Sequence, residues 1–301
     1  MKLRSLLLFI LTSILVVAHA KEIALTFDDA PMGTSWHFES SARTEILIKK
    51  LKGLGVPPVI IFANACNRED SASVILQLTK YKDAGHLIGN HTCSHPRLDD
   101  IGFEKYIKNI EQNEKLLTPL LMGVTFFRYP FLNESIDEKL RDEVRNWLKG
   151  NHYKNGQVSI DNDDYIFSSK INRAKQNGKN IDYKKVEALF LKHVVGAAEF
   201  YDSLAVKTLG RSPKHVILLH EMDATVMFID SLVNEFRKQG WNIISAQDAY
   251  QDEIYSRQPK NTYTNNGFIA QLAKENTGET FSYNGDKETG AELDKILDLK
   301  N

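Results

Sequence analysis

Two short stretches of the sequence carry side chains that could bind a metal ion and activate water. The stretch HTCSH places His91 and His95 four residues apart, a spacing at which two imidazoles can converge on one cation. The stretch LTFDDAP ends an apolar run with the adjacent carboxylates Asp28 and Asp29. Catalytic zinc commonly takes three protein ligands and leaves one position for water, so two histidines and one aspartate would complete such a site. The second aspartate could then act as a base on that water.

Each of these two motifs also has a simpler structural interpretation. A histidine pair at this spacing occurs by chance in many proteins, and no glutamate follows His91 as in the HExxH motif of zinc peptidases. The string DDAP has the composition of a solvated turn. Adjacent aspartates repel each other, however, and a nearby cation would reduce that cost. The two motifs together therefore favour a metal site more strongly than either does alone.

Three further groups of polar residues could contribute to the same chemistry. His220 ends the apolar run HVILLH and could be a neutral core histidine or a general acid. Arg128, at the end of TFFR, could form a surface ion pair, and Asp161, Asp163 and Asp164 could form a solvated acidic turn. Taken singly, each group favours its structural interpretation. Their meaning therefore depends on whether the fold brings them together.

The elements that would position these residues alternate along the chain. Short apolar runs predict strands, and apolar residues at helical spacing predict helices. The expected strands are 22–27, 59–62, 86–89, 124–127, 157–160, 215–219 and 242–245. The expected helices include 71–84, 134–149, 182–209 and 225–239, with helical stripes around 47–54 and 103–121 and a polar surface loop at 168–180. Such alternation predicts a parallel sheet, as a doubly wound sheet or a (β/α) barrel.

A barrel is favoured because the candidate residues each lie just past the C-terminal end of an expected strand. In (β/α) barrels, the active site is assembled from several loops at that end of the strands. Five separate segments bring ionisable side chains to this rim, which packing alone does not explain.

The N-terminus has the pattern of a secretory signal peptide. Lys2 and Arg4 precede an apolar run over 6–17, and an A-x-A cleavage pattern follows at 18–20. The run is short for a membrane span of about 20 residues. We therefore expect residues 1–20 to be removed, the mature chain to start near Lys21, and the protein to be periplasmic or extracellular without stable membrane insertion.

Composition places the chain among ordinary globular proteins. Its 301 residues are 42% hydrophobic and 26% charged, with a net charge of −1, so a nucleic-acid partner is disfavoured. Cys66 and Cys93 could pair or stay free, and Cys93 is interpreted as a packed side chain. The segment 259–301 has few apolar residues and is expected to be a peripheral or partly disordered extension. The sequence does not indicate an oligomeric state.

Taken together, five strings resemble the motifs of a known family. TFDDAP, HTCSH, RYPF, DNDDY and LLH occur in this order and are similar to the five motifs of the polysaccharide deacetylases, the NodB-like carbohydrate esterases of family 4. The resemblance runs from about residue 23 to 249. It implies a distorted, seven-stranded (β/α) barrel over 21–258. It also implies a metal-dependent hydrolase that removes N-acetyl groups from amino sugars of a peptidoglycan-like or chitin-like glycan.

The resemblance further implies a role for each matching residue. Asp29, His91 and His95 would bind a divalent metal ion, zinc in first place and cobalt or another transition metal as alternatives. Asp28 would be the general base, and Arg128 would position it.

The remaining matches concern the general acid and the walls of the substrate pocket. His220 would protonate the departing amine, and the backbone N–H of Phe131 would help to stabilise the oxyanion. Tyr165 and Leu218 would line the pocket for the acetyl group. Asp161 or Asp164 would tune the neighbouring groups.

The chain departs from the family pattern at three places, of which the first two are mild and the third leaves the substrate open, because inserted loops on the rim reshape the groove. Ala30 replaces the usual glycine, Tyr165 replaces the usual tryptophan, and the stretch between the third and fifth motifs is long. An esterase for O-acetyl groups is compatible with the same residues, because the same chemistry serves esters and amides. A non-catalytic carbohydrate-binding protein on this fold is a second competing hypothesis, and a zinc amidase or peptidase is a third.

Overall fold

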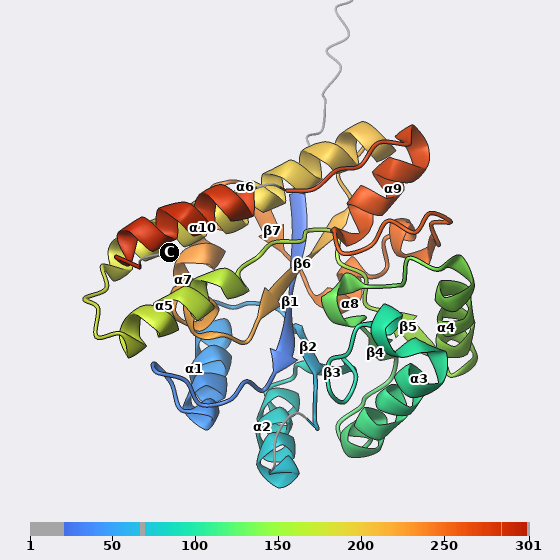
Figure 1. Ribbon diagram of the computed structural model, residues 1–301, viewed down its shortest axis with the longest axis horizontal. Helices are drawn as coiled ribbons and strands as arrows, with labels where there is room; N and C mark the ends of the chain where they lie inside the picture. The colour runs from blue at the N-terminus through green and yellow to red at the C-terminus, as the bar shows by residue number, and fades with distance from the viewer. Residues whose placement is uncertain (1–20, 67–69, 284, 300–301) are drawn as a thin grey trace, which may run out of the picture.

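Seven parallel strands form one curled sheet at the centre of the protein, with helices around its outside (Figure 1). The computed structural model describes residues 21–66, 70–283 and 285–299, so the expected signal peptide lies outside the described residues. The strand order is β5-β4-β3-β2-β1-β6, and β7 pairs with β1. This arrangement confirms the distorted, seven-stranded (β/α) barrel. The strands are β1 (Lys21–Ala30), β2 (Ile60–Ala63), β3 (Leu87–Asn90), β4 (Thr125–Phe127), β5 (Tyr153–Asn155), β6 (Lys214–His220) and β7 (Trp241–Ile243).

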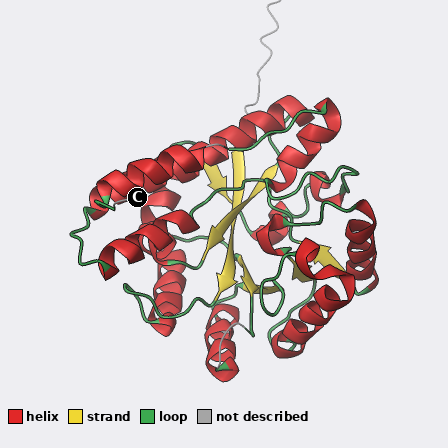
Figure 2. Ribbon diagram, in the orientation of Figure 1, coloured by secondary structure: helices red, strands yellow, loops and turns green. Residues whose placement is uncertain are grey.

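Helices follow most strands and cover the outer face of the sheet (Figure 2). Asp70 caps the start of α2, because its side chain accepts a hydrogen bond from the Ser73 N–H. The longer helices of the barrel are α1 (Ser40–Gly53), α2 (Ser71–Asp83), α3 (Leu98–Leu117), α4 (Glu138–Gly150), α5 (Tyr165–Gln176), α6 (Tyr183–Leu209) and α7 (Asp223–Lys238). Three short helices complete this part of the chain: η1 (Pro130–Leu132), α8 (Ala246–Ala249) and η2 (Glu253–Ser256).

Strand β1 is the central element of the sheet. Its residues from Ile23 to Phe27 are buried, as expected for a parallel strand that is covered on both faces. On one side it pairs with β6 from Glu22 to Asp28, so Asp28 lies beside His220 in the register. On its other side it pairs with β7 at its start and with β2 at its end. The first and fifth motifs therefore end at the same level of the sheet.

The prediction of a strand at 157–160 was wrong in position. The strand is β5, Tyr153–Asn155, whereas Ile160 forms only an isolated parallel bridge with Ile217 of β6. Gly156 lies between the two pairings, and a Cβ there would come within 2.5 Å of the Phe62 ring. The chain thus pairs with β4, bends at a point where only glycine fits, and then reaches β6. The short strand before the bend, with the sequence YKN, contains no apolar run that a sequence pattern could detect.

The polar loop expected at 168–180 was also wrong over most of its length, because residues 165–176 form α5. Phe167, Ile171 and Ala174 are buried at helical spacing, and the Phe167 ring lies 5.2 Å from that of Phe190 in α6. The outer face of α5 is polar, and the exposed and half-buried residues of this helix outnumber the buried ones. Tertiary packing therefore decides the helix here.

The C-terminal segment is more closely packed than the sequence indicated. Helices α9 (Gly267–Thr277) and α10 (Gly285–Ile296) pack on α6, and Figure 1 shows α10 lying along it. Their few apolar side chains, including Phe268, Leu272 and Leu293, are buried in the main core. Because the apolar residues are concentrated on the inner faces, a low apolar content still anchors both helices. The domain boundary near residue 258 stays a prediction.

None of the helices within the described ranges is both long enough and apolar enough to cross a membrane.

Candidate active site

The residues singled out by the sequence lie together at the C-terminal ends of the strands. All of them except Arg128 and Asp164 line one cavity of about 410 Å³. Arg128 and Asp164 lie directly behind its wall, where they contact Asp28 and His220. A larger cavity of about 820 Å³, between α5 and α10, shares only Tyr165 with this set. The chemistry is therefore concentrated in the smaller cavity.

Asp29, His91 and His95 form the candidate metal site. Their ligand atoms lie within 4.8 Å of one another. Asp29 Oδ1 is 3.4 Å from Nε2 of His95 and 3.7 Å from Nε2 of His91. This oxygen is buried and has no hydrogen-bond partner among the described residues. A buried carboxylate oxygen without a partner is costly unless a cation meets it, so the three residues fit a divalent metal ion.

The protonation of the two histidines agrees with this assignment. His91 Nδ1 lies 2.8 Å from the carbonyl oxygen of Arg128 and must donate to it, which leaves the lone pair on Nε2. Burial lowers the pKa of His91 well below its usual value and also lowers that of His95. Both shifts favour the neutral imidazole, the form that binds a metal ion.

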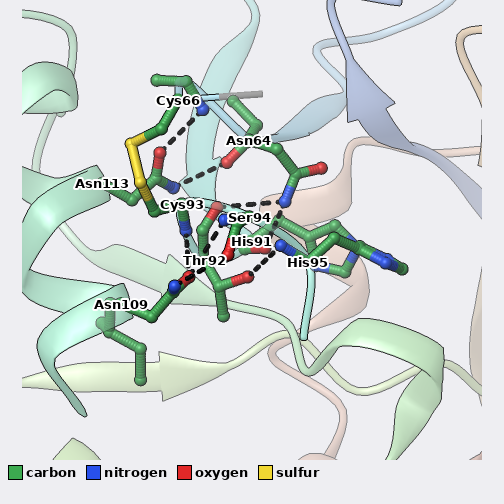
Figure 3. The surroundings of a disulfide bond; sticks show 12 residues. Asn64, Cys66, His91, Thr92, Cys93, Ser94, His95, Asn109 and Asn113 are labelled. Atoms are coloured by element: carbon green, nitrogen blue, oxygen red, sulfur yellow. Dashed lines mark hydrogen bonds between the residues drawn. A yellow bond between two sulfur atoms is a disulfide. The ribbon is translucent and has the colours of Figure 1, made fainter. Parts of the chain in front are cut away.

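The loop that carries the two histidines is held by asparagine side chains (Figure 3). Thr92 and His95 have positive φ angles of 65° and 54°, which non-glycine residues rarely adopt. Asn64 donates to the carbonyl oxygens of His91 and Thr92, the latter at 3.0 Å. Asn109 accepts from the next two backbone N–H groups, of Cys93 and Ser94, at 2.7 and 3.0 Å. The unusual backbone is thus fixed by side chains from β2's end and from α3.

A disulfide bond between Cys66 and Cys93 adds a covalent link to the same loop. The interpretation of Cys93 as a simple packed side chain is therefore corrected. Figure 3 shows the His95 side chain pointing away from this bond. Because Cys93 lies between the two histidines, the disulfide ties the loop that carries the candidate metal ligands to the segment after β2.

Asp28 is held by the guanidinium group of Arg128. The Arg128 Nη1–H donates to Asp28 Oδ1 at 2.5 Å and to the Thr26 hydroxyl at 2.9 Å. Arg128 also donates to the Gly156 carbonyl, at 2.8 Å, and lies 3.9 Å from the centre of the Phe62 ring. Burial raises the pKa of Asp28 to about 6, and Arg128 opposes this shift. The free oxygen, Oδ2, lies 3.7 Å from His91 Nε2 and faces the candidate metal site.

His220 pairs with Asp164 on the opposite side of that site. Asp164 Oδ1 accepts from His220 Nδ1 at 2.6 Å, and its other oxygen accepts from the His220 backbone N–H at 2.9 Å. Thr225 also donates to this carboxylate. Burial alone would lower the pKa of His220, but the Asp164 carboxylate outweighs it and the pKa rises to about 10. His220 Nε2, 4.0 Å from Asp29 Oδ2, is thereby left to carry a proton into the cavity.

The two candidate tuning carboxylates differ in their surroundings. Asp164 is fully buried and bonded to His220, whereas Asp161 lines the cavity itself. Burial, together with the neighbouring Asp163, raises the pKa of Asp161 to about 8. Tyr165 stands edge-on to His220 with ring centres 5.7 Å apart, and Leu218 completes this wall.

The sequence patterns did not indicate several cavity residues. Arg97 lies 4.1 Å from the centre of the Phe131 ring. Asn162 lies within the DNDDY string, where no role was assigned to it, and Met222 lies two residues after His220. Asn265 comes from the C-terminal segment and also lines the cavity. No motif surrounds Asn265, so only the fold could place it here.

Comparison with known proteins supports the family resemblance. Residues 16–147 match the family model of the polysaccharide deacetylases. A peptidoglycan-N-acetylglucosamine deacetylase of Bacillus cereus is 24% identical over 236 residues, which are 76% of this chain and 68% of that protein. This chain is therefore similar to the polysaccharide deacetylases over most of its length. The resemblance of the five strings is thus confirmed, and the family is one of hydrolases that act on acetylated glycans.

Solved structures of polysaccharide deacetylases have the same fold. The Bc1960 peptidoglycan N-acetylglucosamine deacetylase matches with a TM-score of 0.53 and 22% identity, over 76% of this chain and 88% of that chain. A polysaccharide deacetylase of Bacillus cereus, Bc1974, has a TM-score of 0.53 and 17% identity, over 75% and 91%. A mutant of BA3943, described as a pseudoenzyme of carbohydrate esterase family 4, also has a TM-score of 0.53, with 16% identity over 77% and 68%. The fold therefore occurs with and without activity, and activity must be argued from the site.

Proposed function

We propose that this protein is a metal-dependent deacetylase that hydrolyses N-acetyl groups of amino sugars in a glycan, with peptidoglycan as the first candidate substrate. The observation that carries the proposal is the pairing on either side of the candidate metal site. Asp28 with Arg128 lies on one side, and His220 with Asp164 lies on the other. A binding protein would have no need for both an oriented base and an oriented acid.

The metal site would be formed by Asp29, His91 and His95. When bound there, a divalent ion, zinc in first place, supplies Lewis acidity to the acetamide carbonyl and to water. The chain provides neutral imidazoles and an unpartnered carboxylate oxygen to hold it.

The proton transfers are assigned to the two paired groups. Asp28 Oδ2 takes a proton from the attacking water, because Oδ1 is occupied by Arg128. His220 Nε2 gives a proton to the sugar nitrogen as the C–N bond breaks, because Nδ1 is occupied by Asp164. Water and the acetamide are thereby converted to acetate and a free amine. The backbone N–H of Phe131 would donate to the oxyanion, and Tyr165 and Leu218 would enclose the acetyl group.

Export is part of the same proposal. The pattern of residues 1–20 and a glycan substrate outside the cytoplasm both favour a periplasmic or extracellular protein. N-terminal sequencing of the protein from its native host would test cleavage near residue 20.

The test is acetate release from N-acetylglucosamine oligomers, from peptidoglycan and from O-acetylated xylan. Each substrate is assayed with and without a chelator and with zinc added back. We expect release from the N-acetylated substrates that is lost with chelator and restored by zinc. Asp28→Asn should abolish turnover while zinc stays bound, whereas Asp100→Asn, an exposed aspartate of α3, should leave turnover unchanged.

Each contrary outcome points to a different error. Release from xylan alone would indicate an O-acetyl esterase. Bound zinc without release from any substrate would indicate a carbohydrate-binding protein. An active Asp28→Asn protein would remove Asp28 from the role of base.

A further inference from the structure

The C-terminal segment 259–268, which lies outside the five motifs, reaches the active-site cavity. It runs beside α4 (Figure 1), where Arg145 donates to the Pro259 carbonyl at 2.8 Å. Farther along, it brings Asn265 into the cavity wall next to Phe131 and Leu132. A segment distant from the motifs in sequence thus forms part of the rim.

This segment fixes the turn that carries Phe131. Phe131 and Leu132 have φ angles of 58° and 50°, in the left-handed region that bulky residues rarely adopt. The Thr264 hydroxyl donates to the Leu132 carbonyl at 2.6 Å and accepts from the Glu134 N–H at 2.9 Å. The Asn265 N–H donates to the same carbonyl at 3.3 Å. Phe131, held in this way, packs against His95 with ring centres 4.4 Å apart.

The segment is itself firmly anchored on the side away from the turn. The Phe268 N–H donates to the Val158 carbonyl at 2.5 Å, and the Tyr201 hydroxyl donates to the Asn266 carbonyl at 3.1 Å. At Gly267, whose φ is 72°, an added Cβ would lie 3.3 Å from both Asp161 Cβ and the Val158 carbonyl oxygen. The backbone of Asn265 is therefore fixed between two anchored neighbours.

The side chain of Asn265, in contrast, is exposed, and its amide makes no hydrogen bond with the described residues. A carboxamide offers both donors and an acceptor, which matches the hydroxyl and acetamido groups of a sugar. An immobile backbone with an unused amide in a cavity wall is suited to contact a ligand at little cost in entropy.

We propose that Asn265 contacts the glycan directly and that Thr264 positions the Phe131–Leu132 turn, so that the segment 259–268 completes the active site. This inference rests on the proposed deacetylase function. It assigns to Asn265 a hydrogen bond with a hydroxyl or acetamido group of the bound sugar.

The test compares Asn265→Ala with Asn276→Ala, a matched variant of an exposed asparagine in α9 that lies outside the cavity. The first readout is kcat and KM for an N-acetylglucosamine oligomer. The second is calorimetric binding of that oligomer to the same variants in an Asp28→Asn background. We expect Asn265→Ala to raise KM and weaken binding by about three- to tenfold, the effect of one neutral hydrogen bond, with kcat little changed. Asn276→Ala should match the parent protein in both.

Thr264 is tested by a nearly isosteric pair of variants. Thr264→Val removes the hydroxyl and should lower kcat by about three- to tenfold, because the turn is no longer fixed at Leu132. Thr264→Ser keeps the hydroxyl and should restore the parent value. Equal kcat values for the Val and Ser variants would overturn the role of Thr264.

The outcomes separate this inference from the function on which it rests. An active parent protein with an unchanged Asn265→Ala variant would overturn the contact and leave the deacetylase function standing. Asn265-dependent binding without acetate release would support the contact and overturn the function. Neither binding nor release by the parent protein would overturn both.

Discussion

Two edges of the same cavity are held in place by different means. The loop from His91 to His95 is fixed by a disulfide bond and by Asn64 and Asn109. The Phe131–Leu132 turn on the other edge depends on a segment that is remote in sequence. The Thr264 hydroxyl of that segment donates to the Leu132 carbonyl and accepts from the Glu134 N–H. Both edges contain positive φ angles, so both need support from outside.

The difference follows from what each edge would have to hold. Ligands of a metal ion must stay within a few tenths of an ångström of their positions, which favours a covalent link and several hydrogen bonds. A wall that contacts a sugar tolerates looser placement, and a segment outside the motifs can shape it without disturbing the metal site. The edge that carries His91 and His95, the histidine edge, is thus expected to govern metal affinity. The edge formed by the Phe131–Leu132 turn, the turn edge, is expected to govern the binding and turnover of the substrate.

The variant expected to have the largest effect on the histidine edge removes one of the proposed metal ligands. His95→Ala should lower zinc content to near the background and abolish acetate release, because two ligands retain the ion poorly. His152→Ala, at an exposed histidine, is the control and should keep both. Zinc measured by plasma mass spectrometry after dialysis checks this. Full zinc content in His95→Ala would contradict the ligand assignment.

The next largest effect is expected at His220, the proposed general acid. Asp164→Asn removes the carboxylate that holds His220 and keeps its pKa high, so kcat should fall by about 10²- to 10⁴-fold. Zinc content should stay at the parent level, because Asp164 lies behind His220 rather than at the metal site. Steady-state kinetics together with zinc analysis checks both parts. A large loss of zinc would show that Asp164 acts on the metal edge instead.

Opening the disulfide should have an intermediate effect on the histidine edge. Its cysteines are 27 residues apart, and removing such a link lowers the free energy of unfolding by about 2–4 kcal/mol. Cys66→Ser with Cys93→Ser should also weaken zinc binding by about 10- to 100-fold, the range for groups that orient metal ligands. Urea unfolding and competition with a chromogenic chelator measure the two effects. Reduction of the parent protein, with the reductant removed under anaerobic conditions before the titration, should weaken zinc binding, and the same treatment should leave the double variant unchanged.

The smallest effects should separate the two edges most clearly. Asn109→Ala leaves the Cys93 N–H with a weaker partner and the Ser94 N–H with none within the described residues, so zinc affinity should fall by about three- to tenfold. Thr264→Val should lower kcat by a similar factor and leave zinc affinity unchanged. Competition titrations on the two variants check this contrast. Equal loss of zinc affinity in both would show that the edges are coupled.

The sequence predicted those parts of the molecule that local patterns determine. Most strands and helices lie within a few residues of their expected positions. Burial produces a short apolar run in a strand and apolar residues at helical spacing in a helix, and both patterns are visible in the sequence. The aspartates of the first motif, the two histidines of the second, Arg128 and His220 were found because they lie at or just past the end of an apolar strand, and parallel strands bring these ends to one rim. The residues of the pocket walls, Phe131, Tyr165 and Leu218, came from the family resemblance. The errors occurred where pattern and packing disagree. Helix α5 has a mainly polar surface, and β5 is followed by a bend at Gly156.

The sequence alone therefore determined the fold class, the motif residues and the chemistry that they permit. Only the tertiary structure decided which carboxylate pairs with His220, that Cys66 and Cys93 are bonded, and that Asn265 enters the cavity. Each of these depends on two segments far apart in the chain that become neighbours when the sheet curls. A hydrogen bond or a disulfide depends on distances of a few ångströms between such segments, and no periodic pattern in the sequence records those distances.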